Sequence, residues 1–477
     1  MLRALAKNFI IQTAGKGLSV LFGIFILSLL TRALGAEAFG EYTTATTFLQ
    51  FFGVLVDFGL TLTLVVMISE PGADEARVTG NIFSLRLVSA IAFFGLAPLV
   101  VLLLPWNAVI KESVAVGAVA YACMAAAAML VGVFQKHESI WRASTGELVN
   151  RVVLFALAAV FLAFGWGVIA VMWALVAANV AWLAAMLLFA RPFVRIRLRF
   201  EWPVWKRIFA ISWPMALSIA FNLVYLKGDL LTLALFRTQT EVGWYGAAYK
   251  VIDVVTVVPN IFMGLLLPAL AADWKAGRRG EFGAHLQRAF DVFALLFLPI
   301  VAGAELLAAP LLTLIAGRGF AASGGALQLL AFAVPGVFLG ALFGYAVVAV
   351  ERQRKMMWGY LACAIVCAGG YLLLIPPFGI PAAAGVTIFS EWFVALAAFL
   401  VVRREERFRL SLTRAGRALL AALAMALALW FLPRVNVLVL IVLGAALYAG
   451  LLFVFRAVDR QTLRALMPRR LAAHEER

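Results

Sequence analysis

Four cationic residues lie inside long apolar runs of this chain of 477 residues, where charge is unusual. They are Lys16, Arg86, Lys227 and Lys250. A charge near the middle of a bilayer costs about 2.5–3.5 kcal/mol on insertion scales, so it usually faces a bundle interior or a water-filled cavity. Arginine can hold phosphate oxygens in a bidentate manner, and lysine offers a compact point charge. The four side chains therefore predict a binding route for an anionic group, with Arg86 and then Lys227 as the leading candidates.

Acidic residues inside the same runs are suited to a second kind of chemistry, the binding of Na⁺ or the carriage of a proton. The candidates for ion coupling are Asp57, Asp253 and Glu391, and the sequence neither chooses between the two ions nor excludes movement without coupling. Asp57 also has a structural interpretation, as a hydrogen-bond acceptor between helices. Asp229 is two residues from Lys227, so the two side chains point to different helix faces. We assign Asp229 to the anion route.

Several of these charges also have a purely structural interpretation. Lys250 and Asp253 are three residues apart, so they can neutralise each other on one helix face, and the same holds for Arg288 and Asp291. Lys16 lies near the start of the first apolar run, from which a lysine can extend to the membrane surface. The sequence leaves both interpretations open for these residues.

Other kinds of site are excluded by spacing. Gly15-Lys16 is not part of a phosphate-binding G-x-x-x-x-G-K loop, because Ile10 stands where the first glycine belongs. The histidines and cysteines form neither a zinc pattern nor a C-x-x-C pair; they are His137, His285, His474, Cys123, Cys363 and Cys367. We therefore predict no catalytic residue, no metal and no cofactor. With no soluble nucleotide domain, the chain is not expected to be an ATP-driven exporter.

The composition indicates an all-α polytopic membrane protein. Apolar residues make up 65% of the chain and charged residues 13%, whereas soluble domains are nearer half apolar and a quarter charged. The net charge of +16 does not indicate nucleic-acid binding, because no hydrophilic basic domain separates the apolar runs. A bilayer core of about 30 Å needs about 20 helical residues, and we predict about fourteen transmembrane helices: 9–34, 43–68, 79–104, 113–134, 147–164, 167–190, 207–236, 241–267, 284–308, 325–350, 356–376, 382–402, 411–432 and 435–456.

The distribution of basic residues predicts the orientation. Cytoplasmic loops carry an excess of lysine and arginine. With the N-terminus inside, the outer turns hold only five of the 40 basic residues, namely Arg32, Lys111, Arg237, Arg318 and Arg434. This asymmetry favours an even number of spans in a bacterial inner membrane, with both termini cytoplasmic. Tryptophans near the predicted span ends, Trp106 among them, are interpreted as interfacial anchors.

The chain contains an internal repeat. Gly40 and Tyr42 recur 203 residues later as Gly243 and Tyr245, each pair at the start of a long apolar span. Two further echoes follow in the same order at offsets of 217 and 214 residues, namely Trp141 with Trp358 and Phe164-Gly165 with Phe378-Gly379. Six spans separate the copies, and an even number gives both halves the same topology.

The repeat predicts two pseudo-symmetric six-helix bundles with a transport cleft between them. We place the N-terminal lobe at 1–200 and the C-terminal lobe at 201–410, with the basic loop 191–207 as the joint. Residues 411–477 add two further helices and a basic cytoplasmic tail. In span 10, Gly336, Gly340 and Gly344 form a small-xxx-small face for close helix packing.

Short motifs near the start of each half resemble those of the Wzx-type oligosaccharide and O-antigen flippases, a family of the multidrug/oligosaccharidyl-lipid/polysaccharide (MOP) superfamily. In the first half these are Arg32-Ala33-Leu34-Gly35, Phe39-Gly40-Glu41-Tyr42 and Asp57-Phe58-Gly59-Leu60. In the second half they are Lys227-Gly228-Asp229-Leu230-Leu231 and the run from Val242 to Lys250. The resemblance covers roughly residues 5–410.

This resemblance implies alternating access and a polyprenyl-pyrophosphate-linked oligosaccharide as substrate, moved from the cytoplasmic to the periplasmic leaflet for O-antigen, exopolysaccharide or capsule synthesis. It also implies a monomer that works beside a polysaccharide polymerase and a chain-length regulator. The alternatives are a cation-coupled multidrug antiporter of the same superfamily, against which the intramembrane cations count, and a membrane polysaccharide polymerase, for which the large outer loop is missing. The glycan, the coupling ion and the role of the last two helices are not specified by the sequence.

Overall fold

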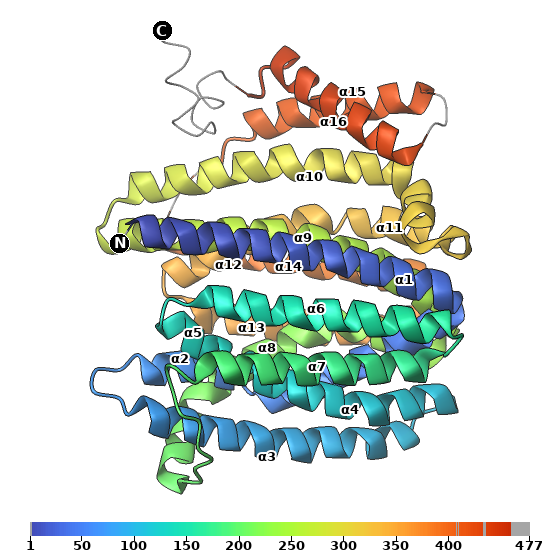
Figure 1. Ribbon diagram of the computed structural model, residues 1–477. Helices are drawn as coiled ribbons and strands as arrows, with labels where there is room; N and C mark the ends of the chain where they lie inside the picture. Colours follow the sequence, from blue (N-terminus) through green and yellow to red (C-terminus); the bar gives the residue numbers. More distant parts are fainter. Residues whose placement is uncertain (1, 407, 409, 433–435, 459–477) are drawn as a thin grey trace. The chain divides into compact units, whose positions relative to one another are not determined.

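The computed structural model describes the backbone of residues 2–406, 408, 410–432 and 436–458, and their side chains except those of 2–14, 16, 214 and 215. Within this part of the chain every regular element is a helix, which confirms the predicted all-α class. The helices (Figure 1) are α1 Leu2–Asp57, α2 Leu60–Ile68, α3 Glu75–Leu102, α4 Ala108–Met129, α5 Val131–Lys136, α6 Ile140–Ala163, α7 Val168–Ala190, α8 Trp202–Phe236, α9 Gln239–Lys275, α10 Arg279–Ala316, η1 Arg318–Phe320, α11 Ser323–Ala331, α12 Val334–Ala349, α13 Gln353–Phe378, α14 Ile380–Glu405, α15 Thr413–Phe431 and α16 Val437–Val454.

The described helices supply the predicted number of membrane spans. Twelve helical segments are long and apolar enough to cross a bilayer, and the pair α11–α12, bent by 40°, adds a thirteenth. One of the twelve, Gly17–Ile68, has 52 residues, more than twice the length that a bilayer needs. It divides at Gly35, whose backbone is not helical, and this division accounts for the fourteenth.

Glycines with positive φ mark three of the turns between spans. Gly35 and Gly165 both have a φ of 76°, and Gly379 has 61°, a region that costs glycine little because it has no Cβ. Gly165 lies between α6 and α7, and Gly379 lies between α13 and α14. The predicted division of spans 5 and 6 is therefore confirmed, and the two glycines of the third echo make the same kind of turn.

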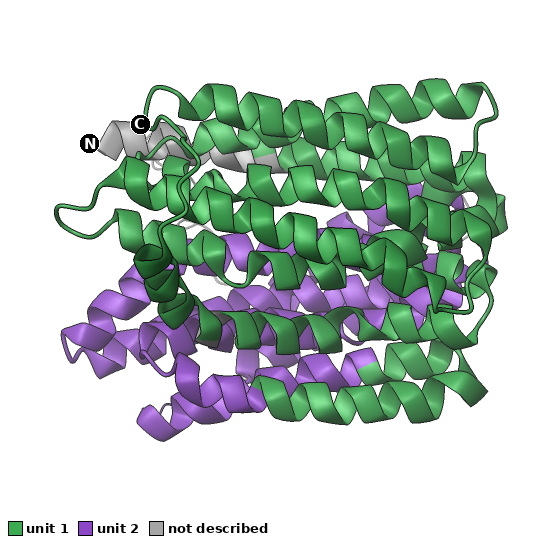
Figure 2. Cartoon of the chain, turned by 90° about the horizontal axis from the view of Figure 1, so that it is seen from below, with its two compact units in different colours: residues 1–247, 315–320, 360–386 green, residues 248–314, 321–359, 387–477 purple. Residues whose placement is uncertain are grey.

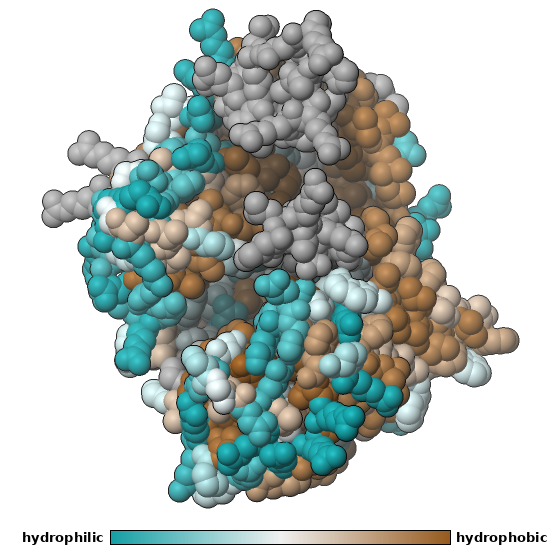
Figure 3. Space-filling view, turned by 60° about the vertical axis from the view of Figure 1, so that its left-hand side comes forward, coloured by the Kyte–Doolittle hydropathy of each residue, from teal (hydrophilic) through white to brown (hydrophobic). Residues whose placement is uncertain are grey.

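Large apolar side chains stay exposed along the helices, as contact with lipid requires; examples are Leu103, Leu373, Trp430 and Phe431. Figure 3 shows hydrophobic residues along the right-hand side of the view and hydrophilic residues at the left and in the lower part. Because a soluble protein rarely exposes apolar patches of this extent, the pattern agrees with a multi-pass membrane protein.

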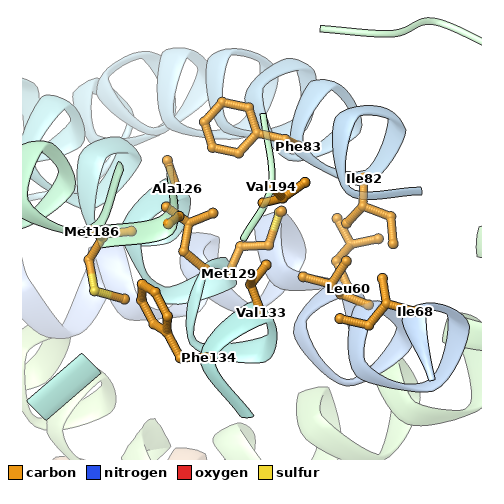
Figure 4. Close-up of a cluster of buried hydrophobic side chains, with 14 of the residues drawn as sticks. Leu60, Ile68, Ile82, Phe83, Ala126, Met129, Val133, Phe134, Met186 and Val194 are labelled. Carbon is orange, nitrogen blue, oxygen red and sulfur yellow. The ribbon is translucent and has the colours of Figure 1, made fainter. Parts of the chain in front are cut away.

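One buried cluster joins the ends of several helices of the N-terminal half. Leu60 and Ile68 of α2 pack with Phe83 of α3, with Met129 at the end of α4 and with Phe134 of α5 (Figure 4). Val194, in the linker between α7 and α8, and Ile208 of α8 belong to the same cluster. The cluster holds the short helices α2 and α5, which are too short to be stable without such packing.

The linker between α7 and α8 packs along α3. A Cβ on Gly80 would lie 2.3 Å from the carbonyl oxygen of Arg197, so only glycine allows this approach. One turn further, the hydroxyl of Ser84 accepts a hydrogen bond of 2.9 Å from the backbone N–H of Arg199. We call residues 194–201 the strap. The basic joint predicted from the sequence therefore follows a defined path on α3.

Glu201 is the last residue of the strap and forms several hydrogen bonds with α3. Its carboxylate accepts hydrogen bonds from Arg77 (2.8 and 2.5 Å) and Asn81 (3.2 Å), and its backbone N–H donates to Asn81 (2.9 Å). The hydrogen bonds from Arg77 and then Asn81 hold the pKa of Glu201 below its usual range. A carboxyl whose folded-state pKa is lowered stabilises the fold above its unfolded pKa, near about 4.3, and loses this effect as the pH falls through the lowered value.

We therefore expect Glu201→Gln to lower the thermal unfolding temperature of the purified protein at pH 7, with a difference from the wild type that shrinks as the pH falls below about 4.3. The matched control is Glu37→Gln, because Glu37 is exposed and forms no ion pair among the described residues. It should change the unfolding temperature little at either pH. A Glu201→Gln difference that is constant with pH would contradict the assigned role.

The two C-terminal helices dock on α10. Arg414 of α15 pairs with Asp291 at 3.1 Å, and the hydroxyl of Tyr448 of α16 donates to the carbonyl oxygen of Leu295 at 3.1 Å. Arg288 instead donates to the carbonyl oxygen one turn before it. The spacing allows Arg288 to pair with Asp291 on one helix, but Asp291 pairs instead with Arg414 of another helix.

The chain divides into two compact units, coloured in Figure 2. Unit 1 comprises 1–247, 315–320 and 360–386, and unit 2 comprises the remaining residues. Their boundaries pass through α9, α10, α13 and α14. Packing thus groups residues from both halves of the sequence, and the division into lobes 1–200 and 201–410 stays a prediction.

Candidate functional site

The second predicted span is interrupted at Asp57-Phe58-Gly59. Helix α1 ends at Asp57 and α2 begins at Leu60, and the residues between them, Phe58 and Gly59, have φ values of 42° and 73°. A left-handed backbone is rare for a bulky side chain. Irregular backbone at membrane depth is tolerated only where it is buried in protein or lines a water-filled cavity. The D-F-G-L motif of the sequence is therefore a helix break.

The carboxylate of Asp57 bridges this break to α3. It accepts hydrogen bonds from the backbone N–H of Gly59 (3.2 Å), from the hydroxyl of Thr61 (2.7 Å) and from Nη2 of Arg86 (2.5 Å). Arg86 also donates to Thr61 at 2.6 Å. The Arg86 side chain is 1% exposed and the Asp57 side chain 28%. The leading candidate for anion binding is thus buried and paired, and the interpretation of Asp57 as an acceptor between helices fits this geometry.

The break is specific to the first half of the chain. At the repeat offset of 203 residues, Asn260 stands in place of Asp57, and α9 continues as a helix through it. In the first half, the hydroxyl of Ser89 on α3 donates to the carbonyl oxygen of Val56 at 3.1 Å, which satisfies a backbone group that the break leaves free. A helix break present in one half and absent at the equivalent position of the other is not part of the repeated scaffold, which favours a role in a binding site.

Two further candidates of unit 1, Asp229 and Lys227, lie on α8. Asp229 is fully buried, and its carboxylate accepts from the hydroxyl of Tyr245 and from the backbone N–H of Leu230, each at 2.7 Å. Lys227 is partly buried on the same helix. Tyr245 belongs to the Gly-x-Tyr echo, so that motif supplies a buried partner for an intramembrane acid.

Two of the remaining candidates pair with each other on one helix. Lys250 and Asp253 of α9 form the i,i+3 pair that their spacing allows, with 3.7 Å between Nζ and Oδ2 and side chains 51% and 39% exposed. Both belong to unit 2. Lys16 falls within α1, and its side chain lies outside the described residues. The structure therefore brings Asp57 to Arg86 and Lys250 to Asp253.

Glu391 of α14 is 8% exposed and lies where α12 passes closely. A Cβ on Gly336 would be 2.9 Å from the backbone carbon of Glu391. The predicted glycine face is used at this position, whereas Gly340 and Gly344 have no atom within 4 Å of an added Cβ.

The two glycines of the first echo lie against each other's helices. A Cβ on Gly40 would be 1.8 Å from the carbonyl oxygen of Gln239, and a Cβ on Gly243 would be 1.9 Å from the carbonyl oxygen of Ala36. Gln239 and Ala36 are themselves 203 residues apart, so the contact is reciprocal, as a pseudo-two-fold axis requires. We call residues 36–47 of α1 and 239–247 of α9, all in unit 1, the glycine seam.

Polar contacts lie within and beside the glycine seam. The hydroxyl of Thr44 donates to the amide oxygen of Gln239 at 2.7 Å, and Nε1 of Trp106 donates to the carbonyl oxygen of Ala234 at 2.8 Å. Trp106 is 6% exposed, so its interpretation as a lipid-facing anchor is wrong. Its position near a span end is correct, but its indole fills the contact with α8 instead of the membrane interface.

Sequence reasoning missed several of these partners. Thr61, Gln239 and the carbonyl of Ala234 carry no charge and match no spacing rule. Glu41, within the family-like F-G-E-Y run, is also buried, and it accepts at 2.5 Å from Asn107, the residue that caps α4. The one usable signal was the repetition of glycine and tyrosine in the two halves.

Comparison with known proteins adds a family. A model of the family described as polysaccharide biosynthesis protein matches residues 5–272, more than half of the chain. No curated protein sequence matches the chain.

Solved structures of similar fold cover most of the chain. The lipid II flippase MurJ, in an inward closed conformation, has a TM-score of 0.77 at 12% identity and covers 94% of this chain and 98% of its own. An inward-facing MATE multidrug resistance transporter of the MOP superfamily has a TM-score of 0.67 at 13% identity and covers 81% and 94%. A MOP superfamily transporter from Pyrococcus furiosus, with a reversed polarity of its binding pocket, has a TM-score of 0.59 at 13% identity and covers 84% and 95%.

Proposed function

Because the chain belongs to the polysaccharide biosynthesis protein family, we propose that it is a MOP-superfamily flippase for a polyprenyl-pyrophosphate-linked oligosaccharide. The coarser statement, a multi-pass membrane transporter with the MOP fold, rests on the family and on the transporters of similar fold. The substrate, its direction from the cytoplasmic to the periplasmic leaflet and the bacterial inner membrane are parts of the proposal.

One observation carries the choice of an anionic cargo. A buried arginine, Arg86, and the N-terminus of the half-helix α2 meet at a break inside a membrane span. Helix N-termini and guanidinium groups both favour negative charge. Discontinuous helices of transporters commonly turn such ends toward anionic substrate groups. A pyrophosphate head fits this chemistry, whereas a cationic drug does not.

The glycine seam supports the proposed mechanism of alternating access. Parts of the two proposed lobes are in backbone contact there, at the end of the helices that the charge distribution assigns to the periplasm. We propose that this end is closed in the described conformation and opens to release the head group. Lys16, Lys227, Lys250 and Asp229 are proposed to line the route, and Asp57, Asp253 and Glu391 remain proposals for ion coupling.

The proposed function is tested by leaflet-specific detection of the glycolipid. Deletion of the gene should trap the pyrophosphate-linked oligosaccharide in the cytoplasmic leaflet, and the wild-type gene should restore its delivery to the periplasmic leaflet. Purified protein in vesicles should move the same lipid between leaflets without a polymerase or chain-length regulator and as a monomer. Unchanged periplasmic delivery in the deletion strain would overturn the proposal.

The second candidate is a cation-coupled multidrug antiporter, favoured by the MATE transporters of similar fold. It predicts drug sensitivity in the deletion strain with normal glycolipid distribution. The exposed pair Lys250 and Asp253 would be the expected place for such coupling.

A further inference from the structure

The contacts at the helix break have the donor set of an anion site. A backbone N–H at the start of α2, the hydroxyl of Thr61 and the guanidinium of Arg86 all point at one carboxylate, that of Asp57. Phosphate groups bind to the same combination, because helix N-termini present free N–H groups and arginine forms charge-assisted hydrogen bonds. Here the anion belongs to the protein itself.

The donors of this site exceed what Asp57 uses. Nε of Arg86 is buried and has no hydrogen-bond partner in the described part of the chain, although the side chain is 99% buried. Buried polar groups are nearly always satisfied in a resting structure. A phosphate group has three acceptor oxygens against two for a carboxylate, so it can occupy donors that Asp57 leaves unused. The 28% exposure of Asp57 gives an incoming ligand access to the carboxylate.

The backbone at the break is also held in an unfavourable form. Phe58 has a φ of 42°, and strained residues of this kind persist only where the surroundings determine them. The flanking Asp57 is held by Gly59, Thr61 and Arg86. The ring of Phe58 packs edge to face on Phe209 of α8, with centroids 5.9 Å apart. Release of Asp57 would therefore relax the break and change its packing on α8.

We propose that the Asp57 carboxylate is an internal occupant of an anion site formed by the start of α2, Thr61 and Arg86, and that phosphate oxygens of the transported head group replace it. The inference rests on the proposed function. It assigns Arg86 to direct contact with substrate in the exchanged state only. Asp57 acts as the competitor that keeps the site closed to other anions and that returns when the head group leaves.

Binding of inorganic pyrophosphate to the purified full-length protein tests the exchange. Asp57→Asn keeps the shape of the side chain and removes the competing charge, so it should bind pyrophosphate at least about tenfold more tightly than the wild type in calorimetry. Asp57→Asn/Arg86→Gln should not bind. Glu112→Gln, at an exposed position of α4, changes the net charge equally, lies outside the site and the glycine seam, and should match the wild type. Equal affinity of Asp57→Asn and wild type would overturn the proposal.

Transport by an apolar double variant, Asp57→Leu/Arg86→Met, separates exchange from a merely structural ion pair. Replacing both partners of a buried ion pair by apolar groups of similar size can leave stability nearly unchanged, so this variant should keep an unfolding temperature close to that of the wild type. Exchange predicts that this stable variant loses glycolipid translocation, whereas a structural pair predicts wild-type translocation, which would sink the inference. Failure of the proposed function and failure of the exchange give different results. If the wild-type protein moves no glycolipid, the proposed function is wrong. The pyrophosphate-binding comparison tests the exchange independently of transport.

Discussion

Oxidation of a Thr43→Cys/Gly246→Cys variant is expected to stop glycolipid translocation, and reduction is expected to restore it. A Cβ on Gly246 would lie 3.5 Å from Cβ of Thr43, and disulfides join Cβ atoms that are about 3.5–4.5 Å apart. The bond would tie α1 to α9 within the glycine seam. If the seam must open in each cycle, a covalent link across it arrests transport while leaving the fold intact.

The measurement is leaflet-specific glycolipid detection in vesicles, before and after oxidation and again after reduction. The background carries no native cysteine, which requires replacement of Cys123, Cys363 and Cys367. The single variants Thr43→Cys and Gly246→Cys are the matched controls, and oxidation should not affect their transport. A cross-linked protein that transports as fast as its reduced form would show that the seam does not open.

The opposite perturbation, Gly40→Val, should force the glycine seam apart. Any Cβ at Gly40 would collide with the carbonyl oxygen of Gln239 at 1.8 Å, and a backbone atom cannot move aside as a flexible side chain can. Overpacking costs roughly 1–3 kcal/mol. Since only the closed state contains this contact, its population relative to an open state should fall by roughly 5- to 150-fold. Gly243→Val should act in the same way, because the contact is reciprocal.

Labelling of Thr44→Cys with an impermeant maleimide from the predicted outer side reports the opening. Thr44 is 2% exposed, so the Thr44→Cys protein with Gly40 unchanged should be labelled slowly. The Thr44→Cys/Gly40→Val protein should be labelled fast. Gly95→Val is the matched control, since an added Cβ at Gly95 of α3 has no atom within 4 Å; it should leave labelling slow. If Gly40→Val leaves Thr44→Cys protected and transport normal, the assignment of the seam as a gate is wrong.

Arg86 shows what the pattern of charges in the sequence can and cannot predict. Its burial inside a span was predictable, because a charge in an apolar run must leave lipid. Its pairing with Asp57 was not, since the two residues are 29 positions apart and meet only where the end of α1 packs on α3. Lys250 and Asp253 are the opposite case, because both lie on one helix and helical geometry alone places them together.

The D-F-G-L motif shows a second limit. Its resemblance to the family was visible in the sequence, but the apolar run from 43 to 68 predicted one continuous span. The break depends on the carboxylate of Asp57 closing over Gly59 and on Ser89 satisfying a backbone carbonyl from another helix. Such compensation comes from neighbouring helices, which hydropathy does not describe.

By itself the sequence determined the helical class, the number of spans and the turns at Gly35 and Gly165, because the length of an apolar helix and the freedom of glycine are local properties. It also revealed the Gly-x-Tyr repeat. Only the tertiary structure decided that Gly40 and Gly243 face each other's helices and that the leading cation is held by a carboxylate at a helix break. These contacts join residues far apart in the chain, so they follow from how whole helices pack and not from the pattern within any one of them.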